Sequence, residues 1–247
     1  MRFQNTNAPA SGNAIGYDFP DIAGLIGFWN FGGSELASRR NWVDGSLASV
    51  TGAVTYADSY AIFDADAGFY TTNIAEPRDV SVLALFKTPD TLADNAHRPV
   101  ILANDDTAAV ADPLRTSQGV SLFVSSATAI SFAAARYASG TSSSGALAAT
   151  LPAGALASWS LLGGRASDTV RRTESVTGNV SATAAASARD PASSLMKIGG
   201  GISGYGGVGH LSLLAIVSAA YSDADRDLLA EFMRAVAAGK PTPITGI

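Results

Sequence analysis

Short apolar runs separated by turn residues occupy most of this 247-residue chain, and they predict an all-β fold. In residues 80–86 the side chains of Val80, Val82, Ala84 and Phe86 fall on one face, as expected for a half-buried strand of an antiparallel sheet. Repeated short strands with Gly, Pro, Asn, Asp or Ser between them are typical of sandwiches and barrels. The runs are 25–31, 61–63, 69–71, 80–86, 100–103, 120–124, 130–134, 159–162, 169–173, 195–198 and 211–217.

One helix is predicted, over Asp223–Ala238. Ser222 is a suitable N-cap, and Asp225 three residues later completes a capping box. Gly239 followed by Pro241 ends the helix. The helix carries a single apolar stripe at helical spacing, formed by Leu228, Leu229, Phe232 and Val236. We expect this stripe to lie flat on the edge of the sandwich or on a partner.

The predicted organisation is one domain with two extensions. Residues 1–22 are polar and aperiodic, and we expect an extended N-terminal arm that packs on a neighbour rather than on its own core. Residues 23–239 form the β-sandwich domain, and 240–247 form a C-terminal tail. Residues 138–157 are rich in Ser, Gly and Ala, which predicts a surface loop or hairpin tip. A domain boundary there is disfavoured, because the strands after it are too few for a separate core.

Composition excludes several classes of partner and chemistry. The net charge is −5 and no basic cluster exceeds a pair of arginines, so nucleic acid is not an expected partner. The absence of cysteine removes disulfides, thiolate metal sites and cysteine nucleophiles. The sequence contains no apolar stretch of about 18 residues, so no membrane span is predicted. The first residues carry no signal-peptide pattern, which predicts synthesis in a cytoplasm without export.

An ordered series of segments resembles the laminin-G-like, concanavalin A-like lectin–glucanase jelly-roll family. Residues 24–32 resemble its opening strand, 79–87 its central apolar strand ending in Phe-Lys, and 159–162 a strand of its back sheet. The glycine-flanked strand at 198–200, then the closing strand and helix, complete the order. This resemblance implies a two-sheet antiparallel jelly-roll sandwich with one C-terminal helix. Residues 168–174 depart from the family in lacking an Asn-Gly or Asp-Gly turn, so the register there is open.

No catalytic pattern accompanies the resemblance, and we predict that the protein is not an enzyme. Glucanases of this fold use paired carboxylates on one strand, because retaining hydrolysis needs two carboxyl groups about 5–5.5 Å apart. Every glutamate here is isolated, at Glu35, Glu76, Glu174 and Glu231, and no E-x-D sequence occurs. His97 and His210 lack metal spacing, and no G-x-S-x-G nucleophile elbow is present.

A sugar site would need an aromatic platform with a few polar groups beside it. The candidate ligand-binding residues are Tyr137, Arg165, Tyr205 and His210, with Trp159 as a further platform residue. The alternatives are core packing for Trp159, turn positions for the tyrosines and a hydrogen-bonded strand-end position for His210. No cofactor is predicted and no metal ligand is assigned.

Calcium is the ion that the fold would most readily take, through carboxylates and carbonyls in its loops. The candidate ligands are Asp105 and Asp106 with Asp112, and Asp64 with Asp66. Paired aspartates in a loop are also ordinary solvated turn residues, and no EF-hand spacing is present.

We predict a non-enzymatic structural or binding protein of a virus particle, such as a bacteriophage tail, baseplate or head-surface component. The jelly roll would serve assembly or attachment to the host surface. The expected partners are other virion subunits, further copies of the same chain and a host-surface glycan. The expected location is the virion, after synthesis in the host cytoplasm. The alternative is a free-standing carbohydrate-binding module that recognises cell-surface polysaccharide.

Overall fold

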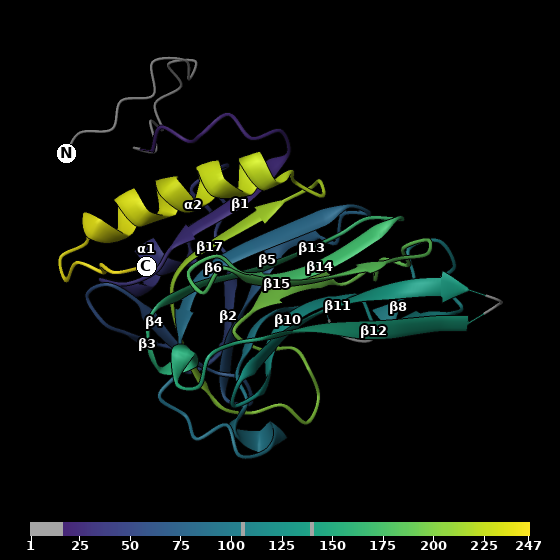
Figure 1. Cartoon of the computed structure of the whole chain (residues 1–247), viewed down its shortest axis with the longest axis horizontal. Helices are drawn as coiled ribbons and strands as arrows, with labels where there is room; N and C mark the ends of the chain where they lie inside the picture. The colour runs from purple at the N-terminus through teal and green to yellow at the C-terminus, as the bar shows by residue number, and fades with distance from the viewer. Residues whose placement is uncertain (1–16, 105–106, 139–140) are drawn as a thin grey trace.

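The computed structural model describes residues 17–104, 107–138 and 141–247, and in this part of the chain antiparallel β-structure dominates. The predicted all-β class with a C-terminal helix is confirmed (Figure 1). The helices are α1 (Glu35–Arg39) and α2 (Asp223–Ala238), with short 3-10 turns at Asn95–His97 and Ala155–Ala157. The strands are β1 (Leu25–Asn30), β2 (Ser49–Gly52), β3 (Thr55–Tyr56), β4 (Ala61–Asp64), β5 (Gly68–Ala75), β6 (Val80–Lys87), β7 (Val100–Ala103), β8 (Thr107–Ala108), β9 (Thr116–Ser117), β10 (Val120–Ser126), β11 (Ala129–Ala138), β12 (Thr141–Thr150), β13 (Ser160–Ala166), β14 (Val170–Ser175), β15 (Val180–Ala185), β16 (Leu195–Ile198) and β17 (Val208–Val217).

Hydrogen bonds join most strands into one curled sheet. Its main path runs β12-β11-β10-β7-β16-β5-β4-β17-β6-β13-β14-β15, while β1 pairs with β17, β2 with β5 and β3 with β4. The two halves of the path pack face to face. Thr173 of β14 bridges them, because its hydroxyl accepts a hydrogen bond from the Phe132 amide at 3.1 Å and donates one to the Leu147 carbonyl at 2.5 Å. At Gly164 of β13 a Cβ would lie 2.3 Å from the Phe132 ring, so this contact requires glycine.

Two apolar layers follow from the alternation of side chains along the strands. The inner layer fills the sandwich and includes Phe63, Phe86 and Phe132, all of them buried. The second layer lies between the sheet and α2, where Leu83 and Leu85 of β6 point to the opposite side from Phe86. Figure 1 shows α2 lying along the β1 and β17 side of the molecule. The sandwich therefore has one outer face covered in part by a helix.

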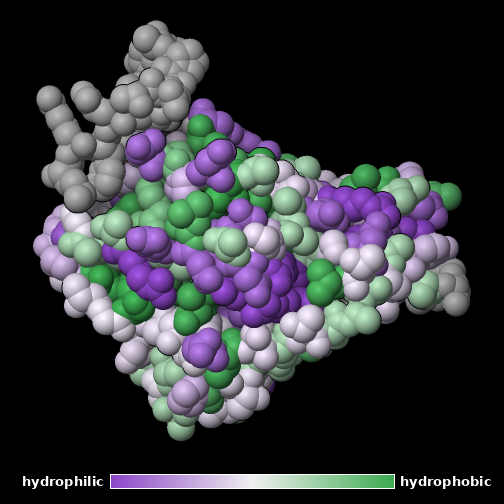
Figure 2. Space-filling model, turned by 45° about the horizontal axis from the view of Figure 1, so that its top comes forward, coloured by the Kyte–Doolittle hydropathy of each residue, from purple (hydrophilic) through white to green (hydrophobic). Residues whose placement is uncertain are grey.

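The capping box predicted for α2 is confirmed. The Ser222 hydroxyl accepts a hydrogen bond from the Asp225 amide, and the Asp225 carboxylate accepts one from the Ser222 amide. The predicted apolar stripe needs one correction. Leu228 is 44% exposed, whereas Leu229 and Met233 are buried against the sheet. Figure 2 shows this side with a hydrophilic patch at its centre and hydrophobic residues in smaller, separate groups, as expected for a helix whose apolar face is turned inward.

The described part of the predicted arm packs on this chain's own core, contrary to the expectation of a neighbour. Tyr17 and Phe19 lie against the Phe28 ring, with ring centroids 5.6 and 5.3 Å away. The predicted C-terminal tail also lies on the domain. Ile244 is buried in the layer under α2, and the Thr242 amide donates to the Ser59 hydroxyl at 3.0 Å. Residues 1–16 of the arm lie outside the described residues.

Most of the segment 138–157, predicted as a surface loop or hairpin tip, is the second strand of a long hairpin. β12 pairs with β11 along its whole length, from Ala129↔Thr150 to Ala138↔Thr141, and the long hairpin extends from the body in Figure 1. Serine, alanine and glycine have low strand propensity, but pairing with a preformed neighbour overrides it. Residues 139–140 lie outside the described residues. None of the described helices is long and apolar enough to cross a membrane.

Candidate functional site

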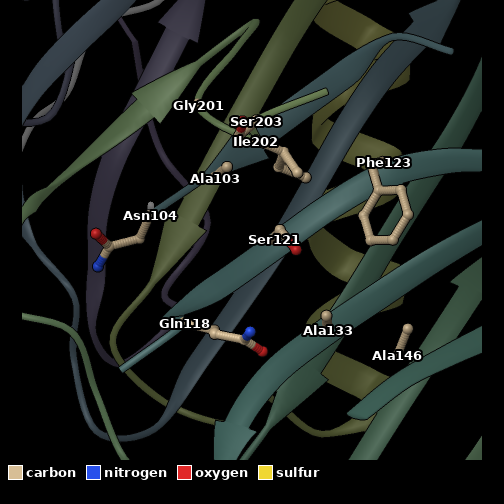
Figure 3. Close-up of a pocket in the computed structure, with 10 residues that line it drawn as sticks. All are labelled: Ala103, Asn104, Gln118, Ser121, Phe123, Ala133, Ala146, Gly201, Ile202 and Ser203. Carbon is tan, nitrogen blue, oxygen red and sulfur yellow. The ribbon is translucent and has the colours of Figure 1, made fainter. Parts of the chain in front are cut away.

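An open groove crosses four neighbouring strands on the outer face of the sandwich half that lacks α2 (Figure 3). Its floor consists of small side chains, Ala103 of β7, Ser121 of β10, Ala133 of β11 and Ala146 of β12. The segment Gly201, Ile202 and Ser203, which follows β16, forms one wall. These floor residues face outward because their neighbours along the strands, such as Leu122 and Phe132, point into the inner layer.

The two ends of the groove differ in chemistry. Figure 3 shows Phe123 and Ile202 toward one end and the amides of Asn104 and Gln118 toward the other. The hydroxyls of Ser121 and Ser203 lie between them. The volume is about 240 Å³, below the roughly 300–1,000 Å³ usual for pockets that enclose a small molecule. The groove therefore suits a short stretch of an extended ligand that has both apolar and hydroxyl-bearing surfaces.

A buried polar network holds the amide end of the groove. The Asn104 side-chain amide donates to the Glu76 carboxylate at 2.8 Å, and the Ala192 backbone amide donates to the same oxygen at 2.9 Å. The other Glu76 oxygen pairs with the Arg189 guanidinium, and Ser194 donates to the Asn104 oxygen. Burial raises the pKa of Glu76, while Arg189 opposes that rise. Asn104 is thus fixed in place from beneath.

One of the residues predicted to bind ligand borders this groove, and a second lies on the same face beyond its amide end. The Tyr205 ring packs edge-on against Phe123, with centroids 5.0 Å apart, at the apolar end. Tyr137 lies on the same face of β11 as Ala133, about 13 Å along the strand and beyond the amide end. The Arg115 guanidinium lies 3.8 Å from the Tyr137 ring centroid, so one face of that ring is covered.

The other two predicted residues lie elsewhere. Arg165 of β13 donates to the Tyr221 carbonyl at 2.5 Å and to the Asp223 carboxylate at 2.8 Å, so it anchors the start of α2. His210 of β17 stacks on Tyr60, with centroids 4.8 Å apart and an interplanar angle of 18°. The alternative prediction, a hydrogen-bonded His210 at a strand end, is wrong for Nδ1. This atom is buried without a partner among the described residues. Burial and, to a smaller extent, Lys87 lower the pKa of His210.

The sequence patterns did not identify Phe123, Ser121 or Gln118. Phe123 lies inside the apolar run 120–124, where it resembles a core residue, and only the alternation along β10 places it outside. Alternation of Ser121 and Phe123 against Val120, Leu122 and Val124 was the available signal.

A second cavity, of about 500 Å³, lies at the C-terminal end of α2 beside Tyr17, Trp42 and Lys240. The Lys240 ammonium donates to the carbonyls of Phe31, Ser59 and Ser212 at 2.7, 2.9 and 3.1 Å. All three of its hydrogens are used within the protein, and this lysine therefore joins α2 to the sheet.

No metal centre is formed in the part of the chain that the structure describes, where no three His, Asp or Glu side chains converge. Of the predicted calcium ligands, Asp64 accepts a hydrogen bond from the Asp66 amide at 3.2 Å, the geometry of a turn residue. Asp112 accepts one from the Leu114 amide at 3.1 Å. Asp105 and Asp106 lie outside the described residues.

Comparison with solved structures shows a shared fold at low sequence identity. Botulinum neurotoxin type C, in a study of its interaction with two ganglioside molecules, superposes with a TM-score of 0.58 at 10% identity, covering 85% of this chain and 51% of that chain. The binding domain of botulinum neurotoxin DC in complex with SialylT gives 0.57 at 11% identity over 85% of this chain and 51% of that one. Trypanosoma rangeli sialidase gives 0.58 at 12% identity over 95% of this chain and 36% of that one.

This chain therefore spans about half the length of the toxin chains that it matches, or less for the sialidase. No family model and no curated protein matches the sequence. What the structural matches establish is the all-β jelly-roll sandwich, the class of fold that the sequence resemblance implied.

Proposed function

We propose that this protein is a glycan-binding module and that the groove over β7, β10, β11 and β12 is its binding site. The groove itself carries the proposal, because the Phe123 ring at one end and the exposed Gln118 side chain at the other line the same open channel. Sugars present C–H faces that pack on aromatic rings and hydroxyls that pair with amides. The matched toxin structures, one from a study of two ganglioside molecules and one in complex with SialylT, support a glycan as the ligand.

The lining of the groove supports binding rather than cleavage. Neither carboxylate nor imidazole is among the residues that line it. The two buried glutamates are engaged elsewhere, Glu76 with Arg189 and Glu174 with Arg172 and Arg226. Glycoside hydrolysis by paired carboxylates needs both groups at the scissile bond. We therefore propose a non-enzymatic role.

A glycan array followed by calorimetry on the best binder tests this function. Ala146 is the exposed floor residue on the edge strand β12, so Ala146→Trp fills the groove without entering the core. We expect that variant to lose at least about ten-fold in affinity, or about 1.4 kcal/mol. Thr183→Trp is the matched control, because Thr183 is exposed on β15 at the other end of the sheet path. Equal binding by both variants would contradict the groove assignment.

Membership in a virus particle and self-association stay predictions from the sequence. Mass spectrometry of purified particles would test the first and sedimentation at several concentrations the second. If this protein is absent from particles and monomeric at every concentration, both predictions are wrong and the free-standing module is the remaining hypothesis.

A further inference from the structure

Four side chains outside the groove form a compact cluster on the opposite outer face of the sandwich. We call Tyr60, Lys87, Trp159 and His210 the aromatic–lysine cluster. Lys87 ends β6 and pairs with His210 of β17, and Trp159 directly precedes β13, where Ser160 pairs with Phe86. Tyr60 directly precedes β4, which pairs with β17 on its other side. Strand register therefore brings together residues that are up to 150 positions apart.

The cluster surrounds one cation with aromatic rings. The Lys87 ammonium lies 4.8 Å from the Trp159 ring centroid and 5.5 Å from that of Tyr60. The two rings are 5.5 Å apart at an interplanar angle of 64°, and His210 stacks against Tyr60. All four side chains are only half-buried, so solvent reaches them. His210 therefore orients the Tyr60 ring, while Trp159 and Tyr60 hold the ammonium at the surface.

Lys87 differs from most cations of this protein in its partners. No ion pair or hydrogen bond of its ammonium exists among the described residues, and the rings are its contacts. By contrast, Arg165, Arg172 and Arg226 all contact Asp223 near the start of α2. An ammonium held beside aromatic faces without a carboxylate is positioned to receive an anion from a ligand.

The chemistry of the cluster narrows the ligand. A single ammonium is a compact point charge, which suits a ligand group with one negative charge, such as a carboxylate. Flanking rings favour a ligand that presents apolar C–H groups next to its charge. We propose that the aromatic–lysine cluster binds a carboxylate-bearing sugar, with the sugar ring against Trp159 and Tyr60 and the carboxylate on Lys87. The choice of a sugar rests on the proposed glycan-binding function, whereas the preference for an anion rests on the cluster alone.

The test uses two tetrasaccharides that differ only at C6. One is the β1,4-linked tetramer of glucuronic acid and the other is cellotetraose, and affinities are measured by calorimetry on the full chain. We expect the glucuronate tetramer to bind the wild-type protein about ten-fold or more tightly than cellotetraose. Lys87→Met keeps the apolar stem but removes the charge, and it should abolish that preference. Lys87→Arg keeps a positive charge and should retain most of the preference.

Lys197→Met is the matched control, because the Lys197 ammonium also lies over an aromatic ring, at 5.6 Å from Phe69, and the substitution removes the same charge. We expect Lys197→Met to change the preference for the glucuronate tetramer by less than about two-fold. The proposal is overturned if wild-type protein does not prefer the glucuronate tetramer, or if Lys197→Met removes the preference and Lys87→Met does not. Ala146→Trp separates the two sites. If Ala146→Trp loses array binding but keeps the glucuronate preference, both proposed sites are supported. If the wild-type protein binds nothing on the array but prefers the glucuronate tetramer, only the groove proposal is refuted.

Discussion

Glu76 and Arg189 form an ion pair in which both side chains are completely buried. Two further donors, from Asn104 and the Ala192 backbone, satisfy the Glu76 carboxylate, and Arg189 Nε donates to the Arg78 carbonyl at 3.1 Å. The pair joins the end of β5 to the segment that leads into β16. Because Asn104 lines the groove, this buried pair also determines where the amide end of the proposed glycan site lies.

Removing one member of the pair should be costly. We expect Glu76→Ala or Arg189→Met to lower the free energy of unfolding by about 3–5 kcal/mol, since each leaves an uncompensated buried charge. The double variant Glu76→Met with Arg189→Met should lose less than the sum of the two. Urea denaturation measures all three. Arg78→Met is the control, because its pair with Asp168 is exposed and should contribute no more than about 1 kcal/mol.

Lys240 should make stability depend on pH in the alkaline range. Burial lowers the pKa of Lys240 from 10.5 to about 7. Between those values the unfolded chain keeps a proton that the folded chain has released, so the free energy of unfolding rises with pH. Lys240→Met lacks this group. We expect the wild-type value minus the variant value to increase by up to about 4 kcal/mol between pH 7 and 10. A flat difference in urea titrations would contradict the assigned pKa.

The two histidines should titrate on opposite sides of pH 6.5. Asp94, whose carboxylate is 2.7 Å from His97 Nδ1, raises the pKa of His97. Burial and Lys87 lower that of His210. Proton NMR resolves both, because the chain has only two histidines. Asp94→Asn should lower the pKa of His97 alone, and Lys87→Met should raise the pKa of His210 alone. Movement of both in either variant would show that the shifts have another cause.

The capping box at α2 should contribute measurably to stability. Ser222→Ala removes the acceptor for the Asp225 amide at 3.1 Å and should cost about 0.5–2 kcal/mol. Thermal unfolding followed by circular dichroism measures it. Ser143→Ala is the control, because Ser143 is exposed on an edge strand and should change stability by no more than about 0.5 kcal/mol.

The sequence predicted well those elements whose signal is local. The run at 80–86 becomes β6, and Ser222, Asp225 and Gly239 bound α2 as expected. β12 could not be predicted in this way, because its strand conformation comes from pairing with β11 rather than from its own residues. The five-residue helix α1 could not be predicted either, because it is too short to show helical periodicity.

The candidate sites depend on non-local register, and this limits what the sequence can show about them. Tyr205 packs on Phe123 at the apolar end of the groove, but no sequence pattern connects it to Phe123 or to Gln118. Arg165 has the chemistry of a ligand contact, and only the folded chain reveals that Tyr221 and Asp223 occupy it. Whether the predicted residues bind a ligand awaits the variants proposed above.

β17 pairs with β1, β4 and β6 in the middle of the sheet, although it is the last strand of the chain. A growing polypeptide on the ribosome therefore cannot join the two halves of this sheet until residues 208–217 have been translated and have left the exit tunnel. Earlier strands must wait with unpaired edges, which favours slow folding and exposes the nascent chain to aggregation. Production of this protein should accordingly depend on chaperone supply and on the rate at which residues 208–217 are translated.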